Sequence, residues 1–423
     1  MYVLPIENIK NENVGKKAKN LRDLIKNDLP VPNGFAITSE AFYDFIEKNM
    51  LTERINNIIS DLDVDDFDKL RKASENIMEL INSKNMPGDI KNEIADAYED
   101  MDISKEAKAV GGVALDLVKI GRGQTNVIVR PSTDKDFSPM HAVFARGLSN
   151  LVDAVKKCWS LFYTPEAIFY RRKKGIKDFS IGVVVQKAVD PEKSGNVLIN
   201  DNIVIEASWG FGEGISNGLV IPDRYILEKD GKILNKRVGK KPWRYVRDLL
   251  SNNVVKDSVF SEYINAEVLD DEEIKYIFEI SKKFDNSIIE WCKKRDKFYV
   301  VDVKRFAKVK ETNFSGEVVF KGFGLSSGIA SGKVKFISGS DDFERVEKGD
   351  IIAVQFLSPV FIPILNKING VISEYGGLTS NFALVCREFG IPCIAEVDTS
   401  IFIENQDITI NGYTGEILRV SKG

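Results

Sequence analysis

Two acidic residues near position 300 have the type and surroundings of metal ligands. Glu290 lies in Ile289-Glu290-Trp291 and Asp302 lies in Val301-Asp302-Val303, two apolar runs separated by a polar stretch at 293–297. We expect the two runs to be adjacent strands joined by a turn. Carboxylates that face one cleft supply the hard oxygen ligands that Mg²⁺ accepts beside nucleotide phosphates. Taken singly, each acid is more often a surface residue, so this interpretation depends on cations elsewhere in the chain.

Two basic segments are candidates for those cations. Arg130 follows the apolar run Val127-Ile128-Val129 and precedes Ser132, so its guanidinium would offer planar, paired donors to phosphate at a strand end. Lys17 stands in Val14-Gly15-Lys16-Lys17, directly before a predicted helix, where it could lie near nucleotide phosphates. An arginine at a strand end is more often part of a surface ion pair, and a lysine at a helix start is usually solvated. Neither segment predicts a function alone.

A glycine-rich segment lies between these candidates in the sequence. It reads Glu206-Ala-Ser-Trp-Gly-Phe-Gly-Glu213-Gly214-Ile-Ser-Asn-Gly218, with a tryptophan beside closely spaced glycines. Glycines let the backbone approach a ligand closely. The alternative is a set of tight turns with no ligand.

Histidine chemistry is restricted by composition. The chain has one histidine, His141. Any mechanism that uses a histidine base or phosphate carrier therefore has a single candidate. His141 lies in no recognisable motif, and a lone histidine is more often a packing or surface residue than a catalyst.

The elements that must position these residues indicate a mixed α+β or α/β protein of more than one domain. A chain of 423 residues exceeds what one hydrophobic core usually organises. Helices and strands interleave without a regular βαβ period, which disfavours a doubly wound parallel sheet. Residues 52–105 are charged and carry apolar side chains at helical spacing, so we expect a helical insertion there. The polar stretch 308–316 predicts a linker, which places domains at 1–307 and 317–423.

The hydrophobic pattern predicts the individual elements. Helices are expected at 14–30, from Ser39 onward with Ser39 as the N-cap, at 150–174, at 271–284 and at 379–389, the last with Thr379 as its N-cap. Strands are expected at 35–38, 127–129, 181–186, 196–199, 203–205, 225–227 and 299–303, and in the C-terminal part at 318–320, 332–337, 350–355, 370–373, 408–410 and 416–420.

Composition also argues against several classes of protein. The net charge of −4, from 59 basic and 63 acidic residues, gives no broad positive field, so nucleic acid is not an expected partner. The four cysteines do not have the spacing of a disulfide framework or a zinc clip. We find no secretory signal and no run of about 18 apolar residues, so we expect a cytoplasmic protein that does not span a membrane.

Taken together and in order, the motifs of the first 307 residues resemble the nucleotide-binding domain of phosphoenolpyruvate synthase, pyruvate phosphate dikinase and rifampin phosphotransferase. No single motif is specific, but the ordered set is. The set consists of Val14-Gly15-Lys16-Lys17, Leu29-Pro-Val-Pro-Asn-Gly-Phe-Ala-Ile-Thr38, Val129-Arg130-Pro-Ser132, Val184-Val185-Gln186, Ser194-Gly195, Glu206-Ala-Ser-Trp-Gly-Phe-Gly-Glu213 and Pro222-Asp223-Arg224-Tyr225. The resemblance implies an ATP-grasp fold.

The same resemblance implies the roles of individual residues. It implies that Lys17 and Arg130 contact ATP phosphates, that the Gln186 strand lines the adenine, and that Glu290 and Asp302 hold Mg²⁺. Four departures from the family pattern are Lys16 in place of a glycine, Pro131 in place of a serine, Asp302 in place of the metal-binding glutamine, and Lys304 in place of an arginine, for which Arg305 is a possible substitute. The Phe144–Gly147 loop is expected to be shorter than the family's phosphate-covering loop, because a helix follows it at once.

The C-terminal part resembles the family's swivelling phosphohistidine domain, a small β/β/α-type unit. The best match is Glu374-Tyr-Gly-Gly-Leu-Thr-Ser-Asn381-Phe-Ala-Leu-Val-Cys-Arg-Glu-Phe-Gly-Ile-Pro392. In the family, the histidine that carries phosphate stands at the position of Asn381. The amide nitrogen of asparagine is neither basic nor nucleophilic, so Asn381 cannot accept phosphate.

Three functions remain open from the sequence. The first is an ATP-dependent phosphotransferase that passes phosphate to an unidentified small-molecule or protein acceptor without a histidine carrier. The second is a non-catalytic relative that senses nucleotide or joins a separate subunit, which would supply the substrate domain that we do not find in this chain. The third is an active carrier in which the histidine has been replaced at Asn381.

Overall fold

The computed structural model describes residues 1–419 except 11, 102–123, 135–141, 178, 180, 249–250, 252, 306–317 and 319. The predicted linker at 308–316 and the single histidine, His141, therefore lie outside the described residues. Among the described helices, none combines the length and apolar character that a membrane crossing requires.

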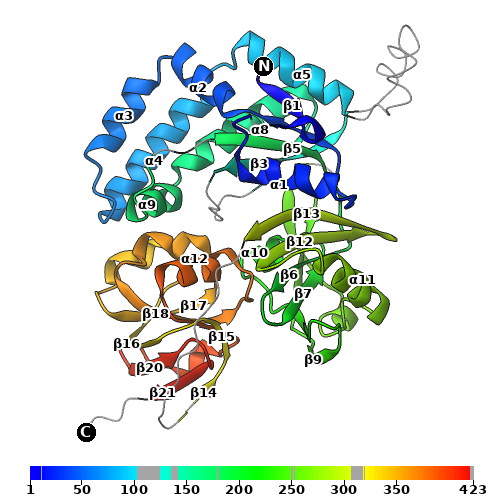
Figure 1. Cartoon of the computed structure of the whole chain (residues 1–423). Helices are drawn as coiled ribbons and strands as arrows, with labels where there is room; N and C mark the ends of the chain where they lie inside the picture. Colours follow the sequence, from blue (N-terminus) through cyan, green and yellow to red (C-terminus); the bar gives the residue numbers. More distant parts are fainter. Residues whose placement is uncertain are drawn as a thin grey trace. The chain divides into compact units, whose positions relative to one another are not determined.

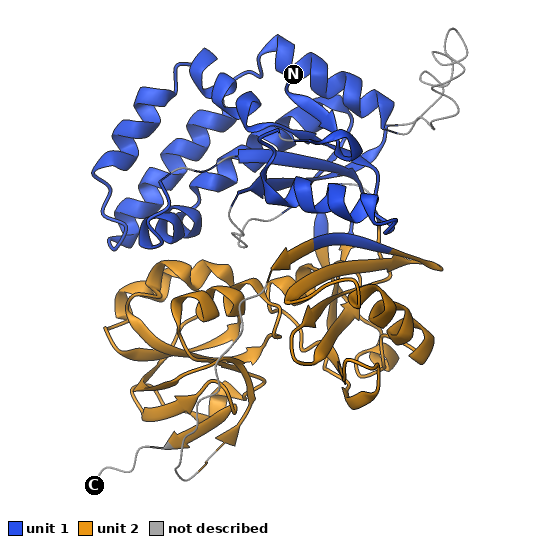
Figure 2. Ribbon diagram, in the orientation of Figure 1, with its two compact units in different colours: residues 1–189, 247–254, 299–302 blue, residues 190–246, 255–298, 303–423 orange. Residues whose placement is uncertain are grey.

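The chain divides into two compact units (Figure 2). Unit 1 contains residues 1–189, 247–254 and 299–302, and unit 2 contains residues 190–246, 255–298 and 303–423. This division cuts through the predicted domain 1–307, whose second half groups with the C-terminal part. The predicted domain boundary stays a prediction.

Unit 1 is built on a five-stranded antiparallel sheet with the strand order β1-β2-β5-β3-β4. Strands β1, β3 and β5 of this sheet are labelled in Figure 1. The strands are β1 (Val3–Pro5), β2 (Gly34–Ile37), β3 (Asn126–Thr133), β4 (Val143–Arg146) and β5 (Ile181–Lys187). Strand β5 is central and reads Ile-Gly-Val-Val-Val-Gln-Lys, an apolar run typical of a strand buried on both faces. Its first six residues are buried, as this pattern predicts.

Several of the described helices of unit 1 lie in the range 52–105, for which helices were predicted. The described helices of the unit are α1 (Gly15–Lys26), α2 (Ser39–Lys48), α3 (Thr52–Ser60), α4 (Phe67–Asn82), α5 (Gly88–Asp100), α8 (Leu148–Ser160) and α9 (Pro165–Lys173). Helix α4 begins where the Asp66 carboxylate accepts a hydrogen bond from the Lys69 amide at 3.1 Å, and it buries an apolar stripe that includes Leu70, Ile77 and Ile81. Helices α3, α4 and α5 confirm the helical expectation for residues 52–105 within the described range.

The first part of unit 2 is a six-stranded sheet with the order β13-β12-β6-β7-β8-β9. The strands are β6 (Lys193–Ile199), β7 (Ile203–Trp209), β8 (Asp223–Leu227), β9 (Ile233–Arg237), β12 (Ser287–Lys294) and β13 (Lys297–Arg305), the last of which has residues 299–302 in unit 1. Two further elements lie in the connections between these strands. They are a short helix, α10 (Glu213–Ser216), and a two-stranded sheet formed by β10 (Trp243–Arg247) and β11 (Val254–Ser258). The predicted neighbouring strands around Glu290 and Asp302 are confirmed as β12 and β13.

Helix α11 (Asp271–Ser281) is fixed to this sheet by Glu273. The Asp270 carboxylate accepts a hydrogen bond from the Glu273 amide, and the Glu273 carboxylate accepts one from the Asp270 amide, which completes a capping box. The Glu273 carboxylate also accepts hydrogen bonds from Lys193 at 2.8 Å and from Lys293 at 2.5 Å. One side chain therefore joins the helix start to strands β6 and β12.

This arrangement predicts how stability depends on pH. Burial opposes ionisation of Glu273, but the hydrogen bonds from Lys193 and Lys293 outweigh it, so the pKa of Glu273 lies below its ordinary value of 4.5. A lowered folded-state pKa contributes stability that is present above the unfolded pKa and lost as pH falls through the folded pKa. We expect Glu273→Gln to lower Tm at neutral pH. Below pH 4.5, the Tm of the variant should fall less than the Tm of the unchanged protein. Melting curves across this range test it; Glu279→Gln, on the same helix but exposed, should change neither quantity.

The C-terminal part of unit 2 is an eight-stranded sheet with the order β14-β21-β20-β16-β17-β18-β19-β15. Strand β16 (Ile329–Phe336) pairs antiparallel with β20 (Asp407–Asn411) through its first half and parallel with β17 (Asp350–Phe356) through its second half. Strand β16 therefore connects two groups of strands, one on the β20 side of the sheet and one on the β17 side. The other elements are β14 (Phe320–Lys321), β15 (Phe323–Ser326), β18 (Ile368–Tyr375), α12 (Asn381–Phe389), β19 (Cys393–Ala395) and β21 (Glu416–Arg419).

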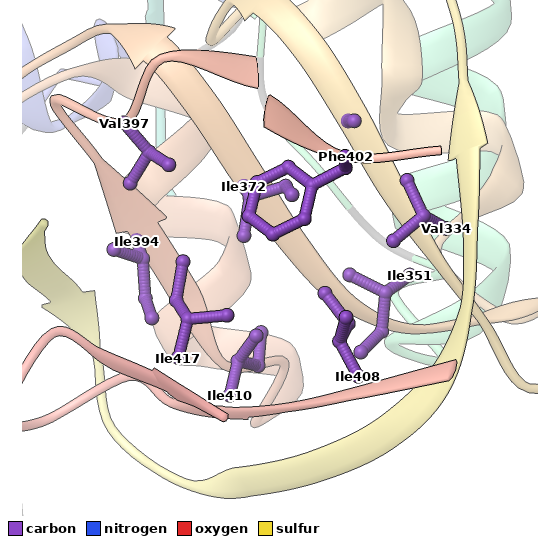
Figure 3. Close-up of a cluster of buried hydrophobic side chains, with 10 residues drawn as sticks. Val334, Ile351, Ile372, Ile394, Val397, Phe402, Ile408, Ile410 and Ile417 are labelled. Carbon is purple, nitrogen blue, oxygen red and sulfur yellow. The ribbon is translucent and has the colours of Figure 1, made fainter. Parts of the chain in front are cut away.

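The core of this part is formed by aliphatic side chains from both groups of strands (Figure 3). Val334, Ile351 and Ile372 face Ile408 and Ile410, and all five are almost fully buried. One continuous apolar core with a helix beside it is the construction expected of a β/β/α-type domain.

The structure corrects several local predictions. The Phe144–Gly147 segment was expected to be a loop, but its residues through Arg146 belong to β4 and pair with β3. Thr38, and not Ser39, occupies the N-cap of α2, and Ser380, and not Thr379, occupies the N-cap of α12. Strands β9, β10 and β11 were not expected from the sequence. Every residue of β9 is exposed, so it lacks the alternation of buried and exposed side chains that identifies a strand.

Candidate nucleotide site

The start of α1 is fixed against β3 by a glycine and a serine. Gly15 has φ = 75°, and a Cβ atom added there would lie 2.2 Å from the carbonyl oxygen of Ser132. The Ala18 amide donates a hydrogen bond to Ser132 Oγ at 3.1 Å, which satisfies one of the amides that a helix start leaves without a partner. Ala18, Leu21 and Leu24 form the buried face of the helix. The motif thus holds Lys17, in the first turn of α1, at a defined place beside β3.

This close packing predicts a strong effect of a small substitution. Gly15→Ala would place a side chain at positive φ against a backbone oxygen, and we expect it to cost about 1–3 kcal/mol of unfolding free energy. It should also weaken nucleotide binding, because the start of α1 would have to move. Gly88→Ala is the matched control, since Gly88 also begins a helix but a Cβ there would meet nothing within 4 Å. Denaturant melts of both variants test this prediction, and equal stability would contradict it.

Lys17 forms an ion pair with Asp302 of β13. Both residues belong to unit 1, and the side chain of Asp302 is only 1% exposed. A buried carboxylate needs a partner of opposite charge or a metal. The structure therefore brings together one predicted phosphate ligand and one predicted metal ligand.

Arg130 is held beside the same strand. Its Nη2 donates a hydrogen bond to the carbonyl oxygen of Val301 at 2.8 Å and another to Gln186 Oε1. Gln186 is buried and donates from Nε2 to the carbonyl oxygen of Pro32 at 2.9 Å. Four of the predicted site residues are thus connected within unit 1. Lys17 and Arg130 each contact β13, which carries Asp302, and Arg130 also donates a hydrogen bond to Gln186. Their predicted contacts with ATP stay predictions.

The remaining basic and acidic candidates lie in unit 2. Glu290 Oε1 accepts a hydrogen bond from Lys304 Nζ at 2.7 Å, and both side chains are about one-fifth exposed. Arg305 is the last residue of β13 and is exposed. Each of the two carboxylates predicted to hold Mg²⁺ is paired with a lysine ammonium, Asp302 with Lys17 and Glu290 with Lys304. The assignment of Glu290 and Asp302 to Mg²⁺ stays a prediction, which the hard oxygen atoms of both side chains would suit.

Asn381 is the first residue of α12 and is 8% exposed. Two residues earlier, the Thr379 hydroxyl donates a hydrogen bond to Glu206 Oε2 at 2.7 Å. The sequence motifs predicted no separate role for Glu206, although it begins the glycine-rich segment. The sequence signal for its role is an acid inside the apolar run Ile203-Val-Ile-Glu206-Ala. An acid buried by such a run requires polar partners.

These features define a protein of mixed α/β construction whose C-terminal part is a small β/β/α-type domain. Residues 11–317 match the family model described as pyruvate phosphate dikinase, AMP/ATP-binding domain, and residues 346–415 match the PEP-utilising enzyme, mobile domain. The chain belongs to the phosphoenolpyruvate synthase and pyruvate phosphate dikinase family. The fold class and the family expected from the sequence are thereby confirmed.

Several curated relatives are about 30% identical to the chain over the aligned residues. A probable phosphoenolpyruvate synthase of Archaeoglobus fulgidus is 33% identical, over 95% of this chain and 56% of that protein. Phosphoenolpyruvate synthase of Pyrococcus furiosus is 30% identical, over 96% of this chain and 57% of that protein. The chain thus spans little more than half the length of these relatives. A solved D-alanine–D-alanine ligase of Bacillus anthracis covers 55% of this chain and 54% of its own, at 9% identity and a TM-score of 0.18, too low to carry an argument about fold.

Proposed function

We propose that the chain binds Mg-ATP and is related to ATP-dependent phosphotransferases, without the usual phosphohistidine relay. The observation that carries the proposal is the group formed by Lys17, Arg130 and Asp302 in unit 1. In this group two cations lie at the same strand as a buried carboxylate. The proposal includes a cytoplasmic location, in keeping with four free thiols.

The chemistry of each side chain supports its proposed role. Lys17 would bind a phosphate oxygen as a point charge, and Arg130 would bind with two parallel N–H donors. Glu290 and Asp302 would hold Mg²⁺, which when bound neutralises phosphate charge and acts as a Lewis acid. Lys304 and Arg305 would add positive charge at the phosphates. Gln186, fixed by Pro32, would support the adenine side.

Asn381 argues against the relay that a histidine would perform. A carrier must offer a lone pair to phosphorus and later release the phosphoryl group, and an amide nitrogen has its lone pair delocalised into the carbonyl. The phosphate would therefore pass directly to an acceptor, which we propose to be a small molecule or a protein. The names of the relatives point to phosphoenolpyruvate chemistry. A separate substrate-domain subunit is proposed as a further partner.

One experiment separates the possible functions. Purified protein is titrated with Mg-ATP in a calorimeter and then incubated with it while ATP, ADP, AMP and phosphate are measured. We expect heat of binding and no phosphoenzyme of the acid-labile kind. ADP would indicate a kinase or ATPase, AMP with phosphate would indicate dikinase-like cleavage, and binding without turnover would indicate a nucleotide sensor. Absence of any heat from folded protein would refute the proposal.

A variant tests the alternative of a replaced carrier. Asn381→His restores the nucleophile at the start of α12. If radiolabelled ATP then produces an acid-labile phosphoenzyme that the unchanged protein lacks, the chain has kept the machinery of a carrier and lost only its histidine. If no label appears while ATP still binds, transfer without a carrier or nucleotide sensing is favoured.

A further inference from the structure

A row of polar side chains crosses one face of the six-stranded sheet in unit 2. Strand register places Glu290 opposite Asn196, Asn196 opposite Glu206, Glu206 opposite Arg224, and Arg224 opposite Arg237. Residues directly opposite each other on paired strands point to the same face. The row therefore runs over five strands, from the proposed metal ligand Glu290 to the edge strand β9.

An apolar row lies beside it on the same face. Ile288, Leu198, Val204 and Ile226 are each two residues along their strand from a member of the polar row, so their side chains share its face. Leu378 and Leu384, from the C-terminal part, pack against this apolar row. The face therefore forms a docking surface for the segment that leads into α12.

Glu206 is the centre of the polar contacts at this surface. Its Oε1 accepts the Leu378 amide at 2.9 Å, and its Oε2 accepts the Thr379 amide at 3.1 Å and the Thr379 hydroxyl at 2.7 Å. Asn196 Nδ2 donates to the same hydroxyl oxygen at 2.8 Å. Glu206 is fully buried, so these bonds replace all the water that the carboxylate would otherwise bind.

Two arginines complete the contact. Arg224 Nη2 lies 3.4 Å from Glu206 and 3.1 Å from Glu396, and its guanidinium stacks 3.4 Å from the centre of the Phe323 ring. Arg237 pairs with the other oxygen of Glu396. Two buried carboxylates are thus balanced by two guanidinium groups, one carboxylate from the sheet and one from the C-terminal part.

We propose that Glu206 is a positioning residue that docks the 377–379 turn on the sheet face and thereby fixes the place of residue 381. The turn fits without free space, since a Cβ atom on Gly377 would lie 2.7 Å from Glu206 Oε1. Because α12 begins two residues after Thr379, a carboxylate that holds both amides of the turn also sets the position of the helix start. The inference goes beyond the proposed function, because it needs neither bound nucleotide nor any phosphate transfer.

Amide hydrogen exchange on the nucleotide-free protein tests the proposal at the two bonds themselves. Glu206→Gln keeps the shape of the side chain but replaces one acceptor oxygen with an NH₂ donor, which cannot accept a backbone amide. We expect the Leu378 and Thr379 amides to exchange at least about tenfold faster in this variant. Thr379→Val removes only the hydroxyl and should give a smaller increase at the same amides. Amides of β17, in the core of the C-terminal part, should be unchanged in both variants.

Two matched variants distinguish docking from general loss of stability. Glu273→Gln removes another buried carboxylate of unit 2, and Thr409→Val removes another buried threonine hydroxyl, one that bonds to Ser331. Neither should speed exchange at Leu378 and Thr379 selectively. Unchanged exchange at these amides in Glu206→Gln, or an equal increase across the whole C-terminal part, would overturn the assignment of Glu206.

Discussion

Replacing Lys17 with methionine is expected to weaken Mg-ATP binding by about 10- to 100-fold, because a hydrogen bond to a charged group contributes about 1.5–3 kcal/mol. The same change leaves the buried Asp302 carboxylate without its ammonium partner, so some loss of stability should accompany it. Calorimetric titration at a temperature where the variant is folded measures the first effect, and thermal melting measures the second.

A second variant separates the two effects of this substitution. In the double variant Lys17→Met with Asp302→Asn, the buried charge is removed together with its partner. Stability should then recover in part, while ATP affinity should stay low or fall further. Lys16→Met is the control, because the adjacent Lys16 side chain is exposed. If Lys17→Met binds ATP as tightly as the unchanged protein, Lys17 is not a phosphate ligand.

The part of the site carried by short motifs could be predicted from the sequence. Lys17 and Arg130 lie in short motifs, and the structure places both at β13, which carries Asp302. Their roles as ATP ligands stay predictions. The role of Glu206 could not be predicted in this way. Its partner Thr379 lies 173 residues away, and no local pattern states which strand face a distant helix start will meet.

The same distinction explains the errors in the fold. Central strands such as β5 were predicted because burial on both faces imposes an apolar run. Edge strand β9 was not, because pairing with β8 is carried by backbone hydrogen bonds that leave no mark on side-chain polarity. Thr379 was expected to cap α12, since its side chain suits that position. The structure instead uses its hydroxyl for a tertiary hydrogen bond, which local propensity does not report.

Asp223 and Lys241 form an ion pair in which both side chains are completely buried. Asp223 also accepts the Gly239 amide at 2.9 Å and the Val268 amide at 2.7 Å, and Lys241 donates to the Gly239 carbonyl oxygen at 2.9 Å. Burial raises the pKa of Asp223 and lowers that of Lys241, so each charged form depends on the other and on these donors. The pair closes the loop after β9 onto the start of β8.

Asp223→Ala is therefore expected to lower the free energy of unfolding by about 3–5 kcal/mol, because it leaves a buried ammonium and two buried amides unpaired. Removing both charges, in Asp223→Ala with Lys241→Met, should cost less than Asp223→Ala alone, since no uncompensated charge then remains. Lys48→Met, which breaks exposed ion pairs with Asp44 and Asp89 and a cation–π contact with Tyr2, should have little effect. Urea unfolding of the four proteins measures these differences. A double variant at least as unstable as the single one would show that the cost comes from lost backbone hydrogen bonds, and not from the unpaired lysine.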